Sequence, residues 1–261
     1  ERGCGVAGMK KKALVFIDYD VLIRHFIMNG TFKELERTYE VTYVFHHDST
    51  SEKQGIYAEL DRIGLQNYIR FEVPRARMGS WDKLYSITTL YAQRGTSNFQ
   101  PRKELMAMAR GRLRTLYYHL LSLPGIFHLI RARLIKEMGV YEPLLEFVRQ
   151  QQPHIIFHPS ILAGYFINEL LIISKRLDIP FVAMMNSWDN PSSKAMNTGL
   201  PDKLVVWGHQ TVQHAMEYLG MPADNIVAFG AAQFQLYREP VQDSDAKLRE
   251  LFKVPPSKPI L

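Results

Sequence analysis

Several side chains that could transfer a proton stand at the ends of short apolar runs in the sequence. Asp18 follows the run ALVFI, His47 follows VTYVFH, and His158 ends the run HIIFH. Imidazoles and carboxylates are the usual general bases toward a hydroxyl group. We select His158 as a catalytic candidate, because the residues behind it open a helical pattern whose N-terminus could face an anion. The alternative is a histidine that caps this helix or bonds to the backbone.

The polar stretch NSWDNPSSK, which follows the run PFVAMM, holds a second group of candidates. Asp189 is our other catalytic candidate, and the flat ring of Trp188 offers a surface on which a sugar or lipid-linked acceptor could stack. Asn186 and Asn190 suit the hydroxyl groups of a substrate, and the ammonium of Lys194 suits a phosphate. The alternative is a turn nucleated by Asp-Asn-Pro-Ser, with Trp188 packed inside the protein.

Asp18, His47 and His209 complete the substrate-binding set that we expect. His209 comes directly after the run LVVWG, at the start of another helical pattern. No spacing of His, Asp or Glu suggests a metal site, GxSxG is absent, and neither GxGxxG nor GxxxxGK[ST] follows the first apolar run. The sequence therefore gives no support for a serine hydrolase, a dinucleotide dehydrogenase or a P-loop NTPase, and we expect no cofactor.

The apolar runs that carry these candidates have the spacing of a parallel sheet. We expect strands at residues 13–17, 41–45, 68–73, 154–157, 180–185, 204–207 and 226–229. Helical patterns at residues 21–37, 52–63, 161–177 and 211–219 separate them, and Gly30 weakens the first. Alternating strands and helices predict an α/β fold with a Rossmann-like doubly wound parallel sheet. Ligands of such sheets bind beyond the carboxyl ends of the strands, where the candidates stand.

A helical segment, residues 78–150, interrupts this alternation. We expect helices near residues 80–94, 102–122, 126–138 and 141–151. Residues 102–136 contain eight basic residues and a single acid. One interpretation is a solvated basic face on core helices, and another is a patch held against anionic lipid, with Arg110, Arg112 and Arg114 facing the membrane. A nucleic-acid partner is not expected, because no recognisable reader motif accompanies the charge.

Composition and the two ends of the chain indicate the cellular compartment and the domain boundaries that we expect. The single cysteine excludes an internal disulfide framework, and no apolar run reaches the length of a membrane span, so we expect a cytoplasmic protein. The net charge is +6. We expect residues 1–8 to precede the native start at Met9, and residues 9–240 to form one domain with the helical insertion. Residues 241–261 should form a helix, a linker and the start of a further domain.

The segment DKLVVWGHQTVQHAMEYLGMPADNIVAFGAAQFQLYREP resembles the end of the N-terminal domain in two-domain GT-B glycosyltransferases. The shared features are a strand that ends in a small residue, a helix, the sequence Gly-Met-Pro, a short strand and an "fd.y"-like stretch at residues 234–237. Gln235 stands where the family often has an aspartate, so no catalytic role is carried over. The resemblance covers residues 13–73 loosely and 150–261 better, and it leaves out the helical insertion.

The resemblance implies an acceptor-side domain whose nucleotide-sugar site lies mostly on a truncated second domain. The implied activity is transfer of a sugar from a nucleotide sugar to a surface polysaccharide or a lipid-linked acceptor, with the fragment inactive alone. Relatives of the family include sugar-nucleotide 2-epimerases and CDP-glycerol-type glycerophosphotransferases of teichoic-acid synthesis, and either activity is an alternative. A non-catalytic α/β binding module is the alternative from another functional class.

Overall fold

The structure is a computed structural model that describes residues 10–46, 60–161, 164–194, 199–238, 244–255 and 258. Expectations about residues 1–9, His47 and most of the helix at 52–63 lie outside these ranges. Of that helix only the last turn is described, and it ends before Gly64, whose φ is 71° as expected for a glycine stop.

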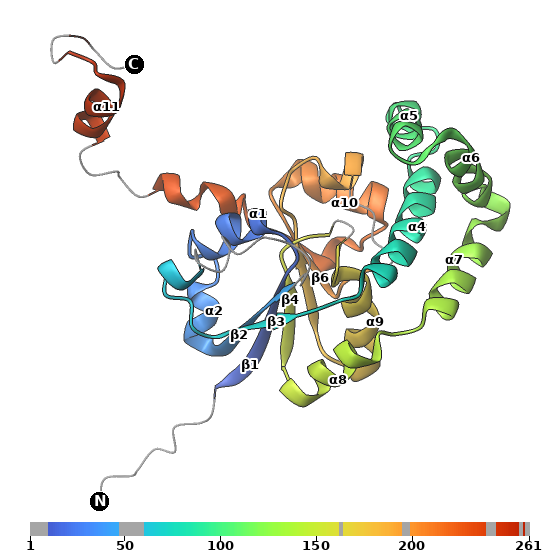
Figure 1. Ribbon diagram of the computed structural model, residues 1–261, viewed down its shortest axis with the longest axis horizontal. Coiled ribbons are helices and arrows are strands. Elements are labelled where there is room, and N and C mark those ends of the chain that lie inside the picture. Colours follow the sequence, from blue (N-terminus) through green and yellow to red (C-terminus); the bar gives the residue numbers. More distant parts are fainter. Residues whose placement is uncertain are drawn as a thin grey trace, which may run out of the picture.

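Seven parallel strands form one sheet in the order β3-β2-β1-β4-β5-β6-β7 (Figure 1). They are β1 (Lys11–Ile17), β2 (Tyr39–His46), β3 (Tyr68–Phe71), β4 (Ile155–His158), β5 (Phe181–Met184), β6 (Lys203–Val206) and β7 (Ile226–Ala228). The chain moves outward from β1 to β3, returns to β4 beside β1, and then moves outward on the other side. Each predicted strand is present, and the expected doubly wound α/β fold is confirmed.

The central strand β1 is buried on both faces, which explains its unbroken apolar run. On one face, Leu14 and Phe16 pack in a cluster with side chains of α8 (Glu142–Gln151) and α9 (Ile167–Leu177). On the other face, Val15 packs in a cluster that contains Phe26 and other side chains from the segment after β1. Helices therefore cover both sides of the sheet centre, as Figure 1 shows for α8 and α9 against α2.

The segment after β1 is not one continuous helix. It contains α1 (Asp20–Leu22), a π-helical turn η1 (Ile23–Ile27) and α2 (Lys33–Thr38). The break lies at Gly30, whose φ of 73° favours glycine. The expected single helix at residues 21–37 is therefore wrong in its continuity, although the weak point was predicted.

The helical insertion contains α4 (Arg75–Ala92), α5 (Phe99–Arg110), α6 (Arg112–Leu121) and α7 (Pro124–Met138). The one helix expected at residues 102–122 is two helices, because Gly111 has a φ of 89° and stops α5. The helices α5, α6 and α7 pack on α4 around Ile87, Leu90, Met106, Tyr118 and Phe127. The insertion therefore has a small core of its own, beside the sheet (Figure 1).

A buried carboxylate fastens the insertion to the sheet layer. Oε1 of Glu169, on α9, accepts from Nε of Arg77 at 2.7 Å and from Nε1 of Trp81 at 2.8 Å. Its Oε2 accepts from the backbone N–H of Tyr141 at 3.0 Å. Arg77 also donates to the carbonyl oxygen of Gly139 at 2.9 Å. The start and the end of the insertion therefore meet at one side chain of α9.

The remaining elements follow the second half of the sheet. They are α10 (His209–Leu219), the short 3-10 helices η3 (Ala223–Asn225) and η4 (Ala232–Arg238), and α11 (Ser244–Phe252). The stretch after β7 is thus largely 3-10 helix, and the helix expected within residues 241–261 is present. Among the described residues, no helix combines the length and the apolar character needed to cross a bilayer.

Candidate functional site

The order of the strands reverses between β1 and β4, and ligands of doubly wound sheets bind in the crevice outside such a point. Two of the predicted site residues meet there. Asp18 directly follows β1, His158 ends β4, and Nε2 of His158 lies 2.8 Å from Oδ2 of Asp18. Both side chains have no exposed surface. The structure therefore brings two separately chosen candidates together, but beneath the surface of the crevice.

The hydrogen-bond partners of His158 determine where protons lie in this pair. Nδ1 of His158 is 2.6 Å from the carbonyl oxygen of Ser160, and a carbonyl can only accept, so Nδ1 carries a hydrogen. A second proton must then lie between Nε2 and Oδ2, since neither atom could otherwise donate to the other. Asp18 and His158 share one proton, and both nitrogens of the imidazole are bonded to protein groups.

The other oxygen of Asp18 faces the start of α9. Oδ1 accepts the backbone N–H groups of Tyr165 at 3.0 Å and Phe166 at 3.1 Å. The carboxylate therefore occupies the position beside a helix N-terminus where an anionic ligand is often bound. The anion site expected behind His158 is filled by the chain itself.

Aromatic side chains lie beside this pair and were not in the predicted set. The His46 ring stacks on the Tyr165 ring, with centroids 3.2 Å apart and planes 13° from parallel, and the Tyr19 ring lies 6.4 Å from that of Tyr165. Burial, and then the charge of Asp18, raise the pKa of Tyr19. His46 ends β2, so its place at a strand end was a usable signal. Tyr165 gave none, because it stood inside a predicted helix.

The polar loop after β5 contributes the second part of the site. Oδ1 of Asn186 lies 2.7 Å from Nδ1 of His25 on η1, and Ser187 Oγ donates to Oδ1 of Asp189 at 2.6 Å. The side chain of Trp188 is 53% exposed, so the alternative of a ring packed inside is wrong. Asn190 is buried, and its Nδ2 has no hydrogen-bond partner in the part of the chain that the structure describes.

This loop is also tied to the helical insertion. It continues into a π-helical turn, η2 (Asn190–Lys194), and the carbonyl oxygen of Ser192 accepts from Gln93 Nε2 at 3.1 Å and from Asn98 Nδ2 at 3.0 Å. The side chain of Lys194 lies outside the described part. The loop therefore bridges the carboxyl end of β5 and the far end of α4.

His209 is exposed as the first residue of α10, at the carboxyl end of β6. Thr211 caps this helix, since its Oγ1 accepts from Gly208 N–H at 2.9 Å and donates to the Gly208 carbonyl at 2.7 Å. His209 thus lies at a helix N-terminus that the bonds between Thr211 and Gly208 stabilise. Within the described ranges, no group of three or more His, Cys, Asp or Glu side chains could hold a metal ion.

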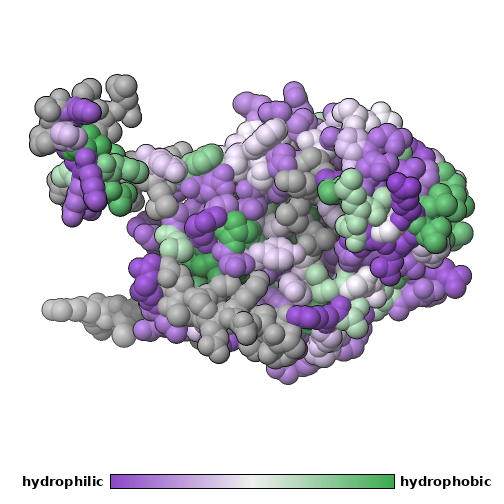
Figure 2. All heavy atoms as spheres, turned by 45° about the horizontal axis from the view of Figure 1, so that its top comes forward, coloured by the Kyte–Doolittle hydropathy of each residue, from purple (hydrophilic) through white to green (hydrophobic). Residues whose placement is uncertain are grey.

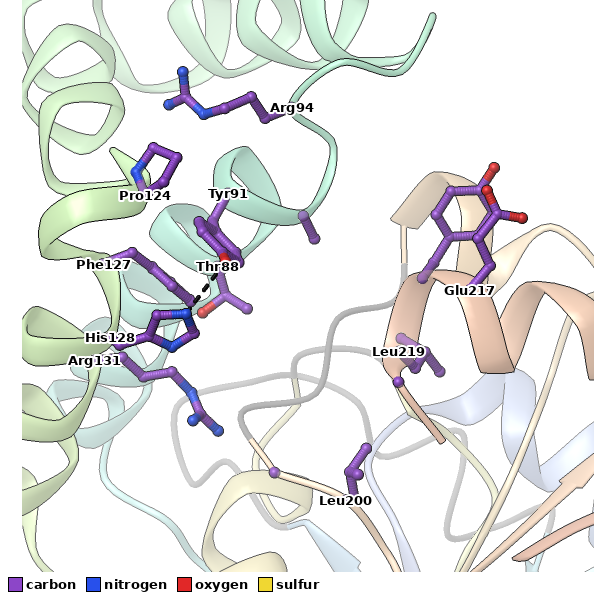
Figure 3. Close-up of a pocket in the computed structure, with 14 residues that line it drawn as sticks. Thr88, Tyr91, Arg94, Pro124, Phe127, His128, Arg131, Leu200, Glu217 and Leu219 are labelled. Atoms are coloured by element: carbon purple, nitrogen blue, oxygen red, sulfur yellow. Dashed lines mark hydrogen bonds between the residues drawn. The ribbon is translucent and has the colours of Figure 1, made fainter. Parts of the chain in front are cut away.

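A pocket of about 620 Å³ opens between the insertion and α10. Figure 3 shows Tyr91, His128 and Arg131 on one side and Glu217 on the other. Tyr91 Oη lies 3.2 Å from Nε2 of His128, and the Tyr91 ring stacks on that of Phe127 with centroids 3.8 Å apart. Burial lowers the pKa of Arg131. None of these residues was predicted, because each stood within a helical pattern.

The three arginines expected to face a membrane have different surroundings. Arg110 forms a two-pronged ion pair with Asp82 of α4, in which Nη2 lies 2.7 Å from Oδ1, and this hydrogen bonding raises its pKa. Arg112 and Arg114 are exposed on α6. Arg110 therefore holds α5 on α4, and only its two neighbours present charge to the outside.

Comparison with known proteins gives likenesses of fold. No protein-family model and no curated protein matches the chain. It is similar to UDP-N-acetylglucosamine 2-epimerase from Rickettsia bellii, with a TM-score of 0.47 and 11% identity over 95% of this chain. It is also similar to Arabidopsis thaliana UGT89C1 complexed with UDP-L-rhamnose, with a TM-score of 0.43 and 12% identity over 95% of this chain. The chain spans about half the length of these structures, 52% and 56% respectively.

Proposed function

We propose that the chain is the acceptor-side domain of a GT-B-type glycosyltransferase, which moves a sugar from a nucleotide sugar to a surface polysaccharide or a lipid-linked acceptor. One observation carries this proposal: the Asp18 carboxylate, buried beneath the crevice beside β1 and β4, accepts the N–H groups at the start of α9. A diphosphate in the crevice above this point would find these N–H donors already occupied. The donor phosphates are then held elsewhere, and this wall of the cleft suits the uncharged hydroxyl groups of an acceptor.

The residues divide into two roles in this proposal. Asp189 is half-buried and serves as the base that takes the proton of the acceptor hydroxyl, while that oxygen bonds to the sugar and the nucleoside diphosphate leaves. The exposed ring of Trp188 beside it stacks on the acceptor. His158 and Asp18 act as positioning residues, because their buried pair fixes the ends of β1 and β4.

The remaining candidates are proposed contacts of the substrate. Asn186, Asn190, His209 and His47 bind hydroxyl groups, and Lys194 binds a phosphate. The proposed setting is the cytoplasm, at the inner face of a membrane, in the synthesis of a surface polysaccharide. The basic residues of the helical insertion support this setting, since anionic lipid attracts them.

The test uses the full-length protein and a panel of nucleotide sugars. Loss of the base in Asp189→Asn should lower kcat/KM by about 100-fold or more. The matched control is Asp178→Asn, an exposed aspartate at the end of α9, which should change kcat/KM little. If the full-length protein binds no nucleotide sugar, the proposal is wrong.

Analysis of the product separates the related activities. A glycoside supports the glycosyltransferase, a free epimerised sugar indicates a 2-epimerase, and a phosphodiester indicates a glycerophosphotransferase. If Asp189→Asn and Trp188→Ala leave every activity of the full-length protein unchanged, the alternative of a non-catalytic binding module gains support.

A further inference from the structure

The segment from α5 to α7 in the helical insertion carries a group of exposed apolar side chains, here called the apolar ridge. Its members are Leu105, Met108, Leu113, Leu116, Tyr117, Leu120, Leu123, Ile126 and Leu129. The most exposed are Met108 at 82%, Leu113 at 85% and Leu129 at 72%. In Figure 2 apolar residues gather at the right edge, over the insertion. Soluble proteins rarely leave such a group uncovered unless it meets a partner.

The insertion does not need the apolar ridge for its own folding. Its helices bury Met106, Tyr118 and Phe127 against α4, so each already has one apolar side turned inward. A helix on the surface of a globular protein is normally apolar on that side alone. The ridge is therefore a second set of apolar side chains on these helices, separate from their buried core. Within it, Tyr117 still contacts α4, because the Lys83 ammonium lies 5.6 Å from the centroid of its ring.

The segment that carries the apolar ridge is rich in basic residues, although Arg110 is paired with Asp82 and Arg131 lines the pocket beside α10. Residues 99–138 contain eight basic residues and two acids, Glu104 and Glu137, and Glu137 is bonded to Arg133 at 2.7 Å. Arg112 and Arg114 are exposed on either side of Leu113 in the sequence. A surface with apolar side chains beside exposed arginines has the chemistry that lies in the headgroup layer of an anionic bilayer.

We propose that the apolar ridge docks on an anionic bilayer, with Met108, Leu113 and Leu129 inserted among the lipids and Arg112 and Arg114 on the lipid phosphates. A second copy of the chain fits less well, since two ridges face to face would oppose arginines with few acids to neutralise them. Anionic lipid supplies that missing countercharge. This surface deepens the membrane setting proposed above, and it does not depend on the sugar chemistry.

The first experiment is co-sedimentation of the full-length protein with vesicles of phosphatidylcholine and phosphatidylglycerol, against phosphatidylcholine alone. Each arginine near the anionic surface contributes about 1 kcal/mol, so R112Q with R114Q should lower binding by about 20- to 30-fold. L113E with L129E should lower it by at least about tenfold, also at raised salt, because the inserted groups are lost. Binding that is unchanged in both variants overturns the proposal.

Matched controls use exposed positions on other helices. K175Q with K247Q removes two exposed charges from α9 and α11, and L251E with F252E places acids on two exposed apolar positions of α11. Both control pairs should bind like the unmodified protein. If they weaken binding as much as the ridge variants, the effect is one of overall charge and the proposal is wrong.

A second experiment measures insertion directly. L113W places a fluorescent ring at one of the positions proposed to insert, where Leu113 is 85% exposed. After subtraction of the signal of the unmodified protein, its emission should shift to the blue on anionic vesicles, and brominated acyl chains should quench it. Absence of quenching shows that the ridge does not enter the bilayer.

Light scattering without lipid tests the competing occupant. A dimer that L113E converts to a monomer overturns the membrane proposal in favour of a second copy, whereas a monomer in both forms supports it. Lipid binding that persists in a protein without sugar transfer contradicts the proposed function alone. Sugar transfer without lipid binding contradicts the ridge proposal alone.

Discussion

Gly164 lies directly against the carboxylate of Asp18. A Cβ built on Gly164 would stand 2.7 Å from Cγ of Asp18, and closer still to its Oδ2. Glycine is needed here because of this close approach and not because of its backbone angle. Replacement by alanine would push the carboxylate away from His158 and from the start of α9.

We therefore expect Gly164→Ala to lower the free energy of unfolding by about 3 kcal/mol or more, since it overpacks a buried site and breaks a buried pair. Urea unfolding measures this loss. Gly199→Ala is the control, because its Cβ would meet only the side chain of Leu171, at an ordinary 3.7 Å. Equal losses in the two variants would contradict the role given to Gly164.

The proton shared by Asp18 and His158 can be tested with two substitutions. The amide in Asp18→Asn can donate to Nε2 of His158 and still accept from the start of α9, so the free energy of unfolding should fall by at most about 1.5 kcal/mol. Asp18→Ala leaves the imidazole and two N–H groups without their partner and should cost about 3–5 kcal/mol. Urea unfolding of both variants checks the difference. A loss as large for the amide as for alanine would show that the carboxylate charge itself is required.

The bonds of Glu169 predict a third stability effect. Glu169→Ala leaves Nε of Arg77 and the indole N–H of Trp81 without an acceptor, so it should lower the free energy of unfolding by about 3–5 kcal/mol. Glu146→Ala is the control, because Glu146 forms an exposed pair with Arg149 and should cost about 0.5 kcal/mol or less. Chemical unfolding compares them, and a small loss for Glu169→Ala would contradict the anchoring role.

Stability at alkaline pH should depend on Tyr43. Burial, and then its hydrogen bond to Glu36, raise the pKa of Tyr43 above the ordinary value of about 10. Above that pH the unfolded chain loses this proton while the folded chain keeps it. The contribution is therefore complete below about pH 10 and declines as the pH rises further.

Tyr43→Phe removes this contribution, so the free energy of unfolding of the variant should fall less steeply between about pH 9 and 11. Unfolding curves at several pH values measure the slope. The control is Tyr237→Phe, since Tyr237 is 83% exposed and should leave the slope unchanged. Parallel curves for Tyr43→Phe and the unmodified protein would contradict the prediction.

The sheet could be predicted from the sequence because each strand is a short apolar run between polar breaks. The boundaries of the helices could be predicted less well from the sequence. The helix expected at residues 161–177 begins only at Ile167, and the carboxylate that binds the two N–H groups just before it comes from Asp18, far away in the chain. Local periodicity contains no information about such a distant partner.

In the candidate site, too, local features could be predicted from the sequence, whereas contacts between distant residues could not. Asp18 and His158 could each be selected from their places at strand ends, but their pairing could not, since 140 positions separate them. The local concentration of basic residues was visible in the sequence. That Arg110 is engaged by Asp82 was not, because this contact depends on how α5 packs against α4.

The helical insertion leaves the sheet near Arg77 and returns at Tyr141, and both positions are bonded to Glu169. The insertion can thus be treated as a long loop whose two ends are held together by the side chain of Glu169, which lies on α9 outside the insertion. The entropic cost of closing a loop grows only slowly with its length. Segments between the two positions can therefore be shortened, extended or exchanged while the spacing of the sheet elements stays fixed. The length of the insertion can therefore change without a change in the contacts of Arg77 and Tyr141 with Glu169.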